Sequence, residues 1–226
     1  MSEDSSVSAV LFDIDGTLLV TGGAGGAAWQ RAFEELYRVE ANVAERTDAG
    51  MTDPQIAEII FRAVVGREGT PEERSKAIGR YLHHLPETVA ASEGYRVMPG
   101  VEELLDRLLD DGFLLGLVTG NIEAAAHIKL SRAGLNRFFS FGGYGSDSAD
   151  RAEVTRAALR RGELVSGGTL TEGACIAVGD TPRDIEAGHA AGVEVVGVAT
   201  GSYSAQQLRD AGADWILETV EHGFPV

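Results

Sequence analysis

The 226-residue sequence lacks several common features, and each absence narrows what the protein can be. Because Cys175 is its single cysteine, the chain cannot form an internal disulfide, which fits a reducing compartment such as the cytoplasm. No apolar run reaches the roughly 18 residues that a membrane-spanning helix needs, so we expect no membrane partner. Residues 1–4 are acidic where a secretory signal is basic, so we expect no export.

Positive charge is also scarce. The sequence has 19 Lys and Arg against 35 Asp and Glu, a formal net charge of −16, and its only lysines are Lys76 and Lys129. Because this charge repels nucleic-acid phosphates, we expect no nucleic-acid partner. A small anionic substrate needs a local cation to offset the charge. The 44% of hydrophobic residues is ordinary for a globular protein of one domain, or of one domain with an insertion.

Strand-like and helix-like segments alternate through the second half of the chain. Strands are predicted at residues 8–12, 113–118, 138–141, 174–178, 193–198 and 215–217. Helices are predicted at residues 101–111, 121–134, 151–161, 183–191 and 204–211, with Asn121 as one N-cap. This alternation predicts an α/β fold, a Rossmann-like parallel sheet with helices on both faces.

Residues 22–95 interrupt this alternation with helices alone. Helices are predicted at 27–37, 54–65 and 70–85, the last opened by a Thr70/Glu73 capping box. A crossover between parallel strands needs only about a dozen residues. We therefore expect a helical cap domain at 21–96, inserted into a core of 1–20 and 97–226, with glycine-rich residues 22–26 as a flexible hinge. The alternative is a longer excursion of one domain.

Carboxylates follow two of the predicted strands. Residues 13–18 (DIDGTL) place Asp13 and Asp15 two positions apart at a strand end, where both point into one cleft. Residues 179–184 (GDTPRD) place Asp180 and Asp184 after another strand, although Asp184 could also cap the following helix. The carboxyl ends of parallel strands are where open α/β sheets build their sites. Such clustered carboxylates repel one another unless a hard cation or a shared proton intervenes.

A third strand end carries residues 119–121 (TGN), which combine a hydroxyl with backbone N–H groups at a helix start. Such a helix start can bind an anion. The same three residues are equally compatible with an ordinary turn and cap.

These three stretches resemble motifs one, two and four of the haloacid dehalogenase superfamily, whose members are mostly phosphohydrolases. The likeness covers residues 7–20 and 97–218, and the helical insertion resembles the type-one cap of phosphoglycolate phosphatase-like members. The loop at residues 50–53 (GMTD) resembles a cap loop of those members.

The resemblance implies roles for individual residues. Asp13 would be the nucleophile and Asp15 the general acid and base. Mg²⁺ would be held by the Asp13 carboxylate, the Asp15 backbone carbonyl and Asp180, with Asp184 in support. Phosphoryl oxygens would be bound by Thr119 and by the backbone amides of Gly120 and Asn121.

The third family motif departs from the usual pattern, because no lysine stands where the family places one. Lys76 lies in the predicted cap, and Lys129 lies two turns into the helix after Asn121. Arg151 occupies the expected segment, and its guanidinium can bind phosphate oxygens. We therefore assign this role to Arg151, with Arg156 as the fallback.

Other features are expected to be structural. Residues 23–28 match the dinucleotide pattern G-x-G-x-x-A but do not directly follow the first strand. Cys175 is expected in the core, and His83 and His84 on the surface.

The predicted function is a Mg²⁺-dependent phosphatase that hydrolyses a small phosphorylated metabolite through an aspartyl-phosphate, as a monomer or homodimer. A phosphomutase of the β-phosphoglucomutase type uses the same two aspartates and stays open. Dehalogenases of the superfamily replace the second aspartate of motif one, so Asp15 argues against that activity. A non-catalytic phospho-accepting signalling module would lack the inserted helices.

Overall fold

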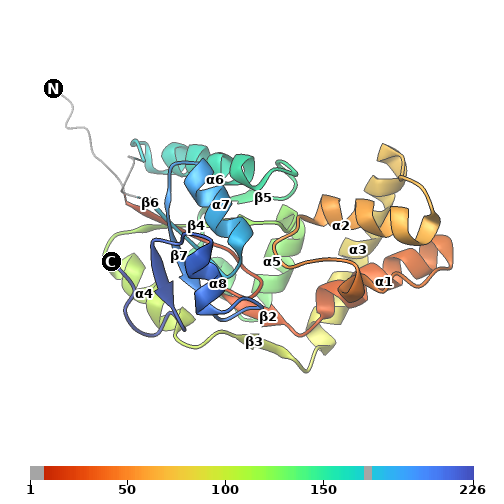
Figure 1. The fold of residues 1–226 in the computed structure, drawn as a ribbon, viewed down its shortest axis with the longest axis horizontal. Coiled ribbons are helices and arrows are strands. Elements are labelled where there is room, and N and C mark those ends of the chain that lie inside the picture. Colours follow the sequence, from red (N-terminus) through yellow and green to blue (C-terminus); the bar gives the residue numbers. More distant parts are fainter. Residues whose placement is uncertain (1–7, 171–174) are drawn as a thin grey trace.

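The computed structural model describes residues 8–170 and 175–226. Its centre is a six-stranded, wholly parallel sheet in the order β5-β4-β1-β6-β7-β8 (Figure 1). The strands are β1 (Ala9–Phe12), β4 (Leu114–Thr119), β5 (Phe141–Tyr144), β6 (Cys175–Gly179), β7 (Glu194–Val198) and β8 (Trp215–Leu217). The predicted α/β class is therefore confirmed.

Alternate side chains of the central strands pack against helices on opposite faces of the sheet. Val10 and Phe12 of β1 face a core built with α4 (Val101–Asp110) and α5 (Glu123–Ser131). Ala9 and Leu11 face the other way. That second core includes α6 (Arg151–Ser166), α7 (Pro182–Ala190) and α8 (Ala205–Asp210). Because the central strands are covered on both sides, they are continuously apolar rather than alternating.

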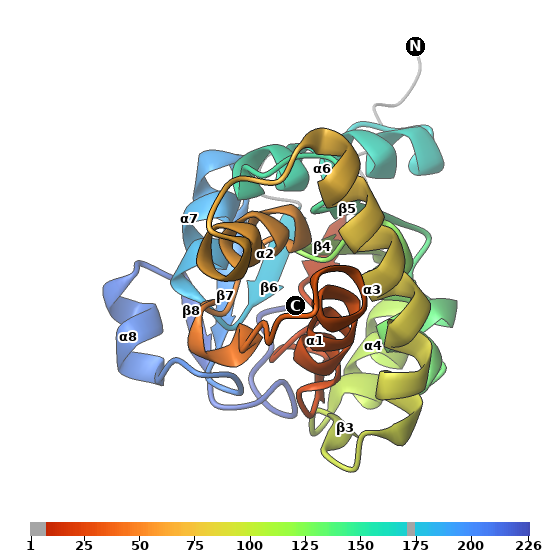
Figure 2. The same cartoon turned by 90° about the vertical axis from the view of Figure 1, so that its right-hand side faces the viewer.

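The helices α1 (Ala24–Tyr37), α2 (Asp53–Ile60) and α3 (Pro71–Ala91) gather at one end of the molecule (Figure 1). Figure 2 looks onto that end and shows them in front of the sheet. They share a hydrophobic cluster of their own, in which the rings of Trp29 and Tyr81 stack at 4.3 Å. Ile122 and Ala125, at and after the start of α5, belong to the same cluster.

Two short strands carry the chain into and out of this helical group. β2 (Leu19–Thr21) pairs antiparallel with β3 (Tyr95–Val97). The Ser92 hydroxyl donates to the Thr21 carbonyl, 2.7 Å away, beside the same ribbon. The helical group is therefore attached to the sheet at its two chain crossings and along α5. The division into core and cap domains stays a prediction.

Several predicted elements need correction. The strand expected at 138–141 begins later, because a 3₁₀ turn (Leu135–Phe138) precedes β5. Of the predicted hinge at residues 22–26, only Gly22 and Gly23 precede α1, since Gly25 and Gly26 lie in its first turn. The predicted helix 54–65 changes to a π-helical turn at Phe61–Val65.

Helix ends also differ from the predictions. α5 has Ile122 rather than Asn121 at its N-cap position, and α6 continues to Ser166. The Thr70/Glu73 capping box is confirmed. Residue 174 of a predicted strand lies outside the described residues. Among the described residues, no helix is both long and apolar enough to cross a membrane.

Candidate active site

The carboxyl ends of β1, β4 and β6 meet at one place, because β1 lies between the other two strands. Asp13 directly follows β1, Thr119 ends β4, and Asp180 directly follows β6. All three side chains are buried. The three predicted motifs are therefore together in space, as neighbouring parallel strand ends require.

The carboxylate cluster consists of Asp13, Asp180 and Asp184, each with an oxygen within 4.8 Å of the others. Burial, reinforced by the Asp184 charge, raises the pKa of Asp13 to about 7 and that of Asp180 to about 9. A Cβ at Gly16, where φ is +90°, would collide with the Asp180 carboxylate. A glycine is therefore required in the turn beside the cluster.

Asp184 has two structural partners besides the other two carboxylates. Its Oδ2 accepts hydrogen bonds from the Thr181 hydroxyl (2.7 Å) and backbone N–H (3.1 Å), which forms the capping box of α7. Its Oδ1 accepts from the Arg151 guanidinium. Asp184 is thus both part of the capping box of α7 and a member of the carboxylate cluster. Its position in the sequence is compatible with both roles.

Arg151 lies at the first turn of α6, 8% exposed, with its guanidinium against the cluster. Besides its bond to Asp184, its Nη2 lies 3.8 Å from Asp13 Oδ1. Among the described residues the Arg151 Nε has no hydrogen-bond partner, so the guanidinium keeps a free donor. The fallback Arg156 is bonded to Glu153 and to the Ala190 carbonyl, away from these groups.

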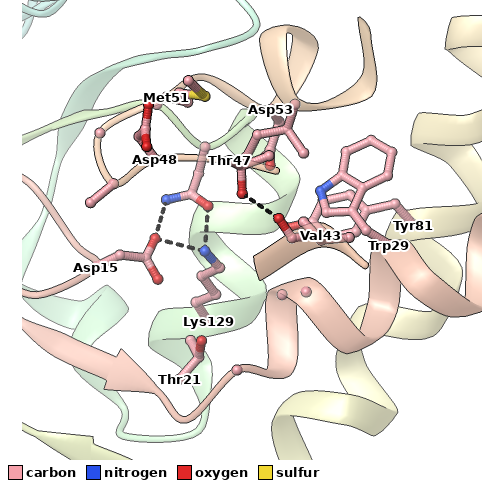
Figure 3. Close-up of a pocket in the computed structure, with 18 of the residues that line it drawn as sticks. Asp15, Thr21, Trp29, Val43, Thr47, Asp48, Met51, Asp53, Tyr81 and Lys129 are labelled. Carbon is pink, nitrogen blue, oxygen red and sulfur yellow. Dashed lines mark hydrogen bonds and ion pairs between the residues drawn. The ribbon is translucent and has the colours of Figure 1, made fainter. Parts of the chain in front are cut away.

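Asp15 has a separate environment. Its side chain is 41% exposed, and its Oδ2 accepts from Lys129 Nζ at 2.6 Å and from Asn121 Nδ2 at 2.8 Å (Figure 3). Lys129 also donates to Asn121 Oδ1, 2.6 Å away. Burial alone would lower the pKa of Lys129, but the Asp15 and Asp53 carboxylates raise it above its ordinary value. Lys129 therefore stays charged at neutral pH.

Lys129, set aside on sequence grounds for the third family motif, nevertheless lies in the site, bonded to Asp15. Lys129 lies about two helical turns after Ile122, the N-cap of α5, and so shares a side of the helix with the residue that follows Asn121. Helical side chains lean toward the N-terminus of their helix, which carries the ammonium back to the strand end. This spacing, together with the length of a lysine side chain, is the signal that could have found it.

The loop after β4 is packed against the start of α2. The Gly120 carbonyl accepts from the Asp53 backbone N–H at 2.8 Å, and a Cβ at Gly120 would collide with the Met51 carbonyl. The Asp53 carboxylate accepts from the Ile122 N–H at 2.9 Å, which caps α5 from another helix. Burial raises the pKa of Asp53 to about 6. The loop at 50–53 is therefore a direct contact between the helical group and the strand ends.

These groups surround a pocket of about 550 Å³. Its floor carries Asp13, Asp15, Thr119, Lys129 and Arg151. Its other walls come from α1, from residues 42–56 and from α3 (Figure 3). A small molecule in this pocket would contact both the strand ends and the helical group.

The carboxylate cluster is chemically suited to a divalent metal ion. Its donors are all oxygens, which hard cations such as Mg²⁺ prefer. The raised pKa values of Asp13 and Asp180 show that the one guanidinium of Arg151 does not compensate three buried carboxylates. A divalent cation would supply the missing positive charge.

The comparisons with known proteins agree with this arrangement. The model of the haloacid dehalogenase-like hydrolase family matches residues 10–198. The chain therefore belongs to that family, which confirms the resemblance in the strand-end motifs and makes it a hydrolytic enzyme.

Individual relatives span nearly the whole chain. It is 29% identical to a phosphoglycolate phosphatase of Synechococcus elongatus, covering 94% of this chain and 93% of that one. It is 26% identical to the pyrophosphatase PpaX of Bacillus velezensis, covering 95% and 94%. A β-phosphoglucomutase structure from Clostridium difficile shares the fold, with a TM-score of 0.71, 18% identity and coverage of 95% and 92%.

The uncompensated carboxylates predict how stability depends on pH without metal. The folded-state pKa values of Asp13 and Asp180 are raised to about 7 and about 9. Their contribution to the free energy of unfolding is therefore fully present below about pH 4. It is lost as the pH rises through those values. In chelator, the free energy of unfolding from urea titrations should fall between pH 5 and 9, and Asp180→Asn should reduce that fall by more than about 1 kcal/mol.

The exposed α4 carboxylate Asp106 offers a matched control, since Asp106→Asn should keep the wild-type slope. An equal pH dependence of the free energy of unfolding in wild type and Asp180→Asn would contradict the repulsion assigned to the carboxylate cluster.

Proposed function

We propose that the protein is a Mg²⁺-dependent phosphatase that hydrolyses a small phosphorylated metabolite through an aspartyl-phosphate on Asp13. The observation that carries the proposal is the contrast between two carboxylates two residues apart. Asp13 is buried against Arg151 and Asp180, whereas Asp15 is half-exposed and held by Lys129. Two carboxylates in such different environments suit two different roles.

In the first step an Asp13 carboxylate oxygen attacks the phosphorus, and the bond from phosphorus to the leaving oxygen breaks. Asp15 protonates that oxygen as it leaves. In the second step water attacks the phosphorus of the aspartyl-phosphate and gives its proton to Asp15. This releases inorganic phosphate, restores the Asp13 carboxylate and leaves Asp15 protonated for the next cycle, so that one difficult step becomes two easier ones.

The phosphoryl oxygens would be bound around the end of β4. The Thr119 hydroxyl and the backbone amides of Gly120 and Asn121 lie at this strand end, next to the pocket floor, where the Asn121 N–H donates to Thr119 Oγ1 at 3.3 Å. Arg151 adds a charge that persists at any working pH. Donors fixed in this way stabilise the charge that develops on the transferring group.

The metal would be held by the Asp13 carboxylate, the Asp15 backbone carbonyl and Asp180. When bound, it would screen the negative charge of Asp13 from the incoming phosphoryl group. Asp184 supports this site by holding Arg151 and by capping α7.

Residues 21–96 would act as a cap domain that covers the pocket and excludes bulk water. The contact between the 50–53 loop and Gly120 supports this role, because it joins the helical group to the phosphate end of the pocket. A small metabolite fits a pocket of about 550 Å³. The cytoplasmic location, the absence of a nucleic-acid partner and a monomeric or homodimeric state stay predictions.

A phosphomutase would use the same pocket floor with a substrate hydroxyl, instead of water, as the final acceptor. A coupled isomerase assay with a hexose 1-phosphate separates the two reactions, because only the mutase produces a hexose 6-phosphate.

Substitution at the two motif-one aspartates tests the mechanism. Asp13→Asn should form no phosphoenzyme with p-nitrophenyl phosphate and Mg²⁺, because the nucleophile is gone. Asp15→Asn keeps the backbone carbonyl and the nucleophile but loses proton transfer, a contribution of roughly 10²–10⁴-fold in rate. Since p-nitrophenolate needs little protonation, this variant should show a burst and gain one phosphoryl group on Asp13 by mass spectrometry.

The burst should be absent in chelator. A phosphorylated Asp13→Asn, or normal turnover by Asp15→Asn, would show that these roles are assigned to the wrong residues.

Arg151 and Lys129 are both buried cations, and each should contribute separately to kcat. Arg151→Ala should lower kcat by about 10²-fold or more, since it removes a fixed donor to the transferring group. Arg151→Lys should retain part of the rate. Lys129→Met keeps the side-chain length but leaves Asp15 without its ammonium, and should lower kcat at least about tenfold through lost proton transfer.

Steady-state kinetics with p-nitrophenyl phosphate measures these effects. Arg156→Ala, which removes an arginine bonded elsewhere, should leave kcat at the wild-type value. Wild-type kcat in Arg151→Ala would eliminate its role in phosphoryl transfer.

A further inference from the structure

The wall of the pocket opposite the carboxylate cluster carries no basic side chain among its described residues. The helical group contributes three acids to the pocket lining, namely Glu45, Asp48 and Asp53. Arg46 lies between the first two in sequence, but its Nε is bonded to the Ala41 carbonyl and it is not part of the lining. The cation that acts on Asp53 is Lys129, whose ammonium is already bonded to Asp15 and Asn121. A leaving group that reaches this wall therefore meets negative charge whose nearest cation is already paired.

Asp53 is the buried member of these three acids, 3% exposed, whereas the other two lie at the exposed rim. Its Oδ2 is held by the Ile122 N–H at the start of α5. Because its own backbone N–H is bonded to Gly120, the carboxylate is fixed next to the loop proposed to bind phosphate. It lies within reach of a short leaving group.

Trp29 supplies a second polar group at the same place. Its indole ring is 1% exposed and stacks on Tyr81 with ring planes only 6° apart, so its orientation is fixed. The indole N–H lies on the side of the ring that faces Asp53 (Figure 3). This N–H acts on the Asp53 carboxylate and lowers its pKa, but in the described part of the chain it forms no hydrogen bond of normal geometry. A buried donor that lacks such a bond is costly, so a ligand atom that accepts from it would be favoured.

The fixed indole N–H of Trp29 beside the fixed carboxylate of Asp53 favours some ligand groups over others. A hydroxyl can accept from the indole N–H and donate to the carboxylate at once. A ligand carboxylate could accept from Trp29 but would be repelled by Asp53. An ammonium could pair with Asp53 but would leave the Trp29 donor unsatisfied.

We propose that Trp29 and Asp53 form a hydroxyl-binding subsite that selects phosphomonoesters with an uncharged, hydroxylated leaving group and rejects those with a carboxylate. This inference rests on the proposed phosphatase function, and it names the substrate class of the same pocket. The class consists of small polyol and sugar phosphates, in contrast to phosphoglycolate.

Matched esters of two lengths test the subsite. The two-carbon set is 2-hydroxyethyl phosphate, ethyl phosphate and phosphoglycolate; the three-carbon set is glycerol 3-phosphate, propyl phosphate and 3-phosphoglycerate. In at least one set, kcat/KM with Mg²⁺ should be at least about tenfold higher for the hydroxylated ester than for both others, because a site built to bind a hydroxyl discriminates against its absence.

Two variants assign the preference to the subsite. Trp29→Phe keeps an aromatic ring but removes the N–H, and should reduce the preference for the hydroxylated over the alkyl ester at least about threefold. Asp53→Asn keeps an acceptor for Ile122 but removes the charge, and should raise the kcat/KM of the carboxylate ester relative to the hydroxylated ester about tenfold. Trp215→Phe, on β8 at the far edge of the sheet, is the matched control and should change neither ratio.

Turnover of p-nitrophenyl phosphate distinguishes a failure of the hydroxyl-binding subsite from a failure of the proposed phosphatase function. If it is hydrolysed but the carboxylate or alkyl ester is preferred in both sets, or no matched ester reacts, the subsite is refuted and the phosphatase stands. If the ratios of kcat/KM between the esters are unchanged in both Trp29→Phe and Asp53→Asn, the subsite is refuted as well. If neither p-nitrophenyl phosphate nor any ester is hydrolysed, the proposed function itself fails.

Discussion

The mutual repulsion of Asp13, Asp180 and Asp184 is the constraint on which the rest of the site depends. Two of these carboxylates lie at adjacent strand ends and the third in the first turn of α7, and all three are buried against the guanidinium of Arg151. Folding brings them together because hydrophobic burial of β1 and β6 places their carboxyl ends side by side. The cost of that proximity is relieved when a cation binds. Without a bound cation, the buried cluster therefore lowers the stability of the fold.

Asp15 escapes this constraint although it lies only two residues from Asp13. The turn at Gly16 directs it away from the cluster toward Lys129 and Asn121, where its charge is paired and partly solvated. The backbone thus separates two identical side chains into two electrostatic environments. One carboxylate is buried beside Arg151 and Asp180, and the other is partly exposed beside Lys129.

Much of this arrangement could be predicted from the sequence, because it depends on local patterns. The apolar runs that end at Asp13 and Asp180 predicted both strand ends and the parallel sheet between them. The strand at Phe141–Tyr144 was misplaced, because Gly142 and Gly143 have low strand propensity. Gly143 is required there because a Cβ would collide with the Val154 carbonyl of α6, a contact between distant segments.

The features that the sequence did not predict are those that depend on packing between elements. Lys129 reaches Asp15 only because α5 starts directly at the pocket floor. The sequence placed Asp53 only in a loop that resembles a cap loop, whereas in the structure it caps α5 and faces Trp29. Such contacts follow from how α1 and α2 pack onto the strand ends, which no local pattern encodes.

Calorimetric titration of Mg²⁺ into the chelator-treated protein tests the central claim most directly. Run at pH 7 in two buffers of different ionisation enthalpy, it counts the protons released on binding. Because the pKa values of Asp13 and Asp180 are raised to about 7 and about 9, binding should release protons, and Asp180→Asn should abolish most of this release. Mg²⁺ binding without proton release, or with unchanged release in Asp180→Asn, would show that the metal does not bind at this carboxylate cluster.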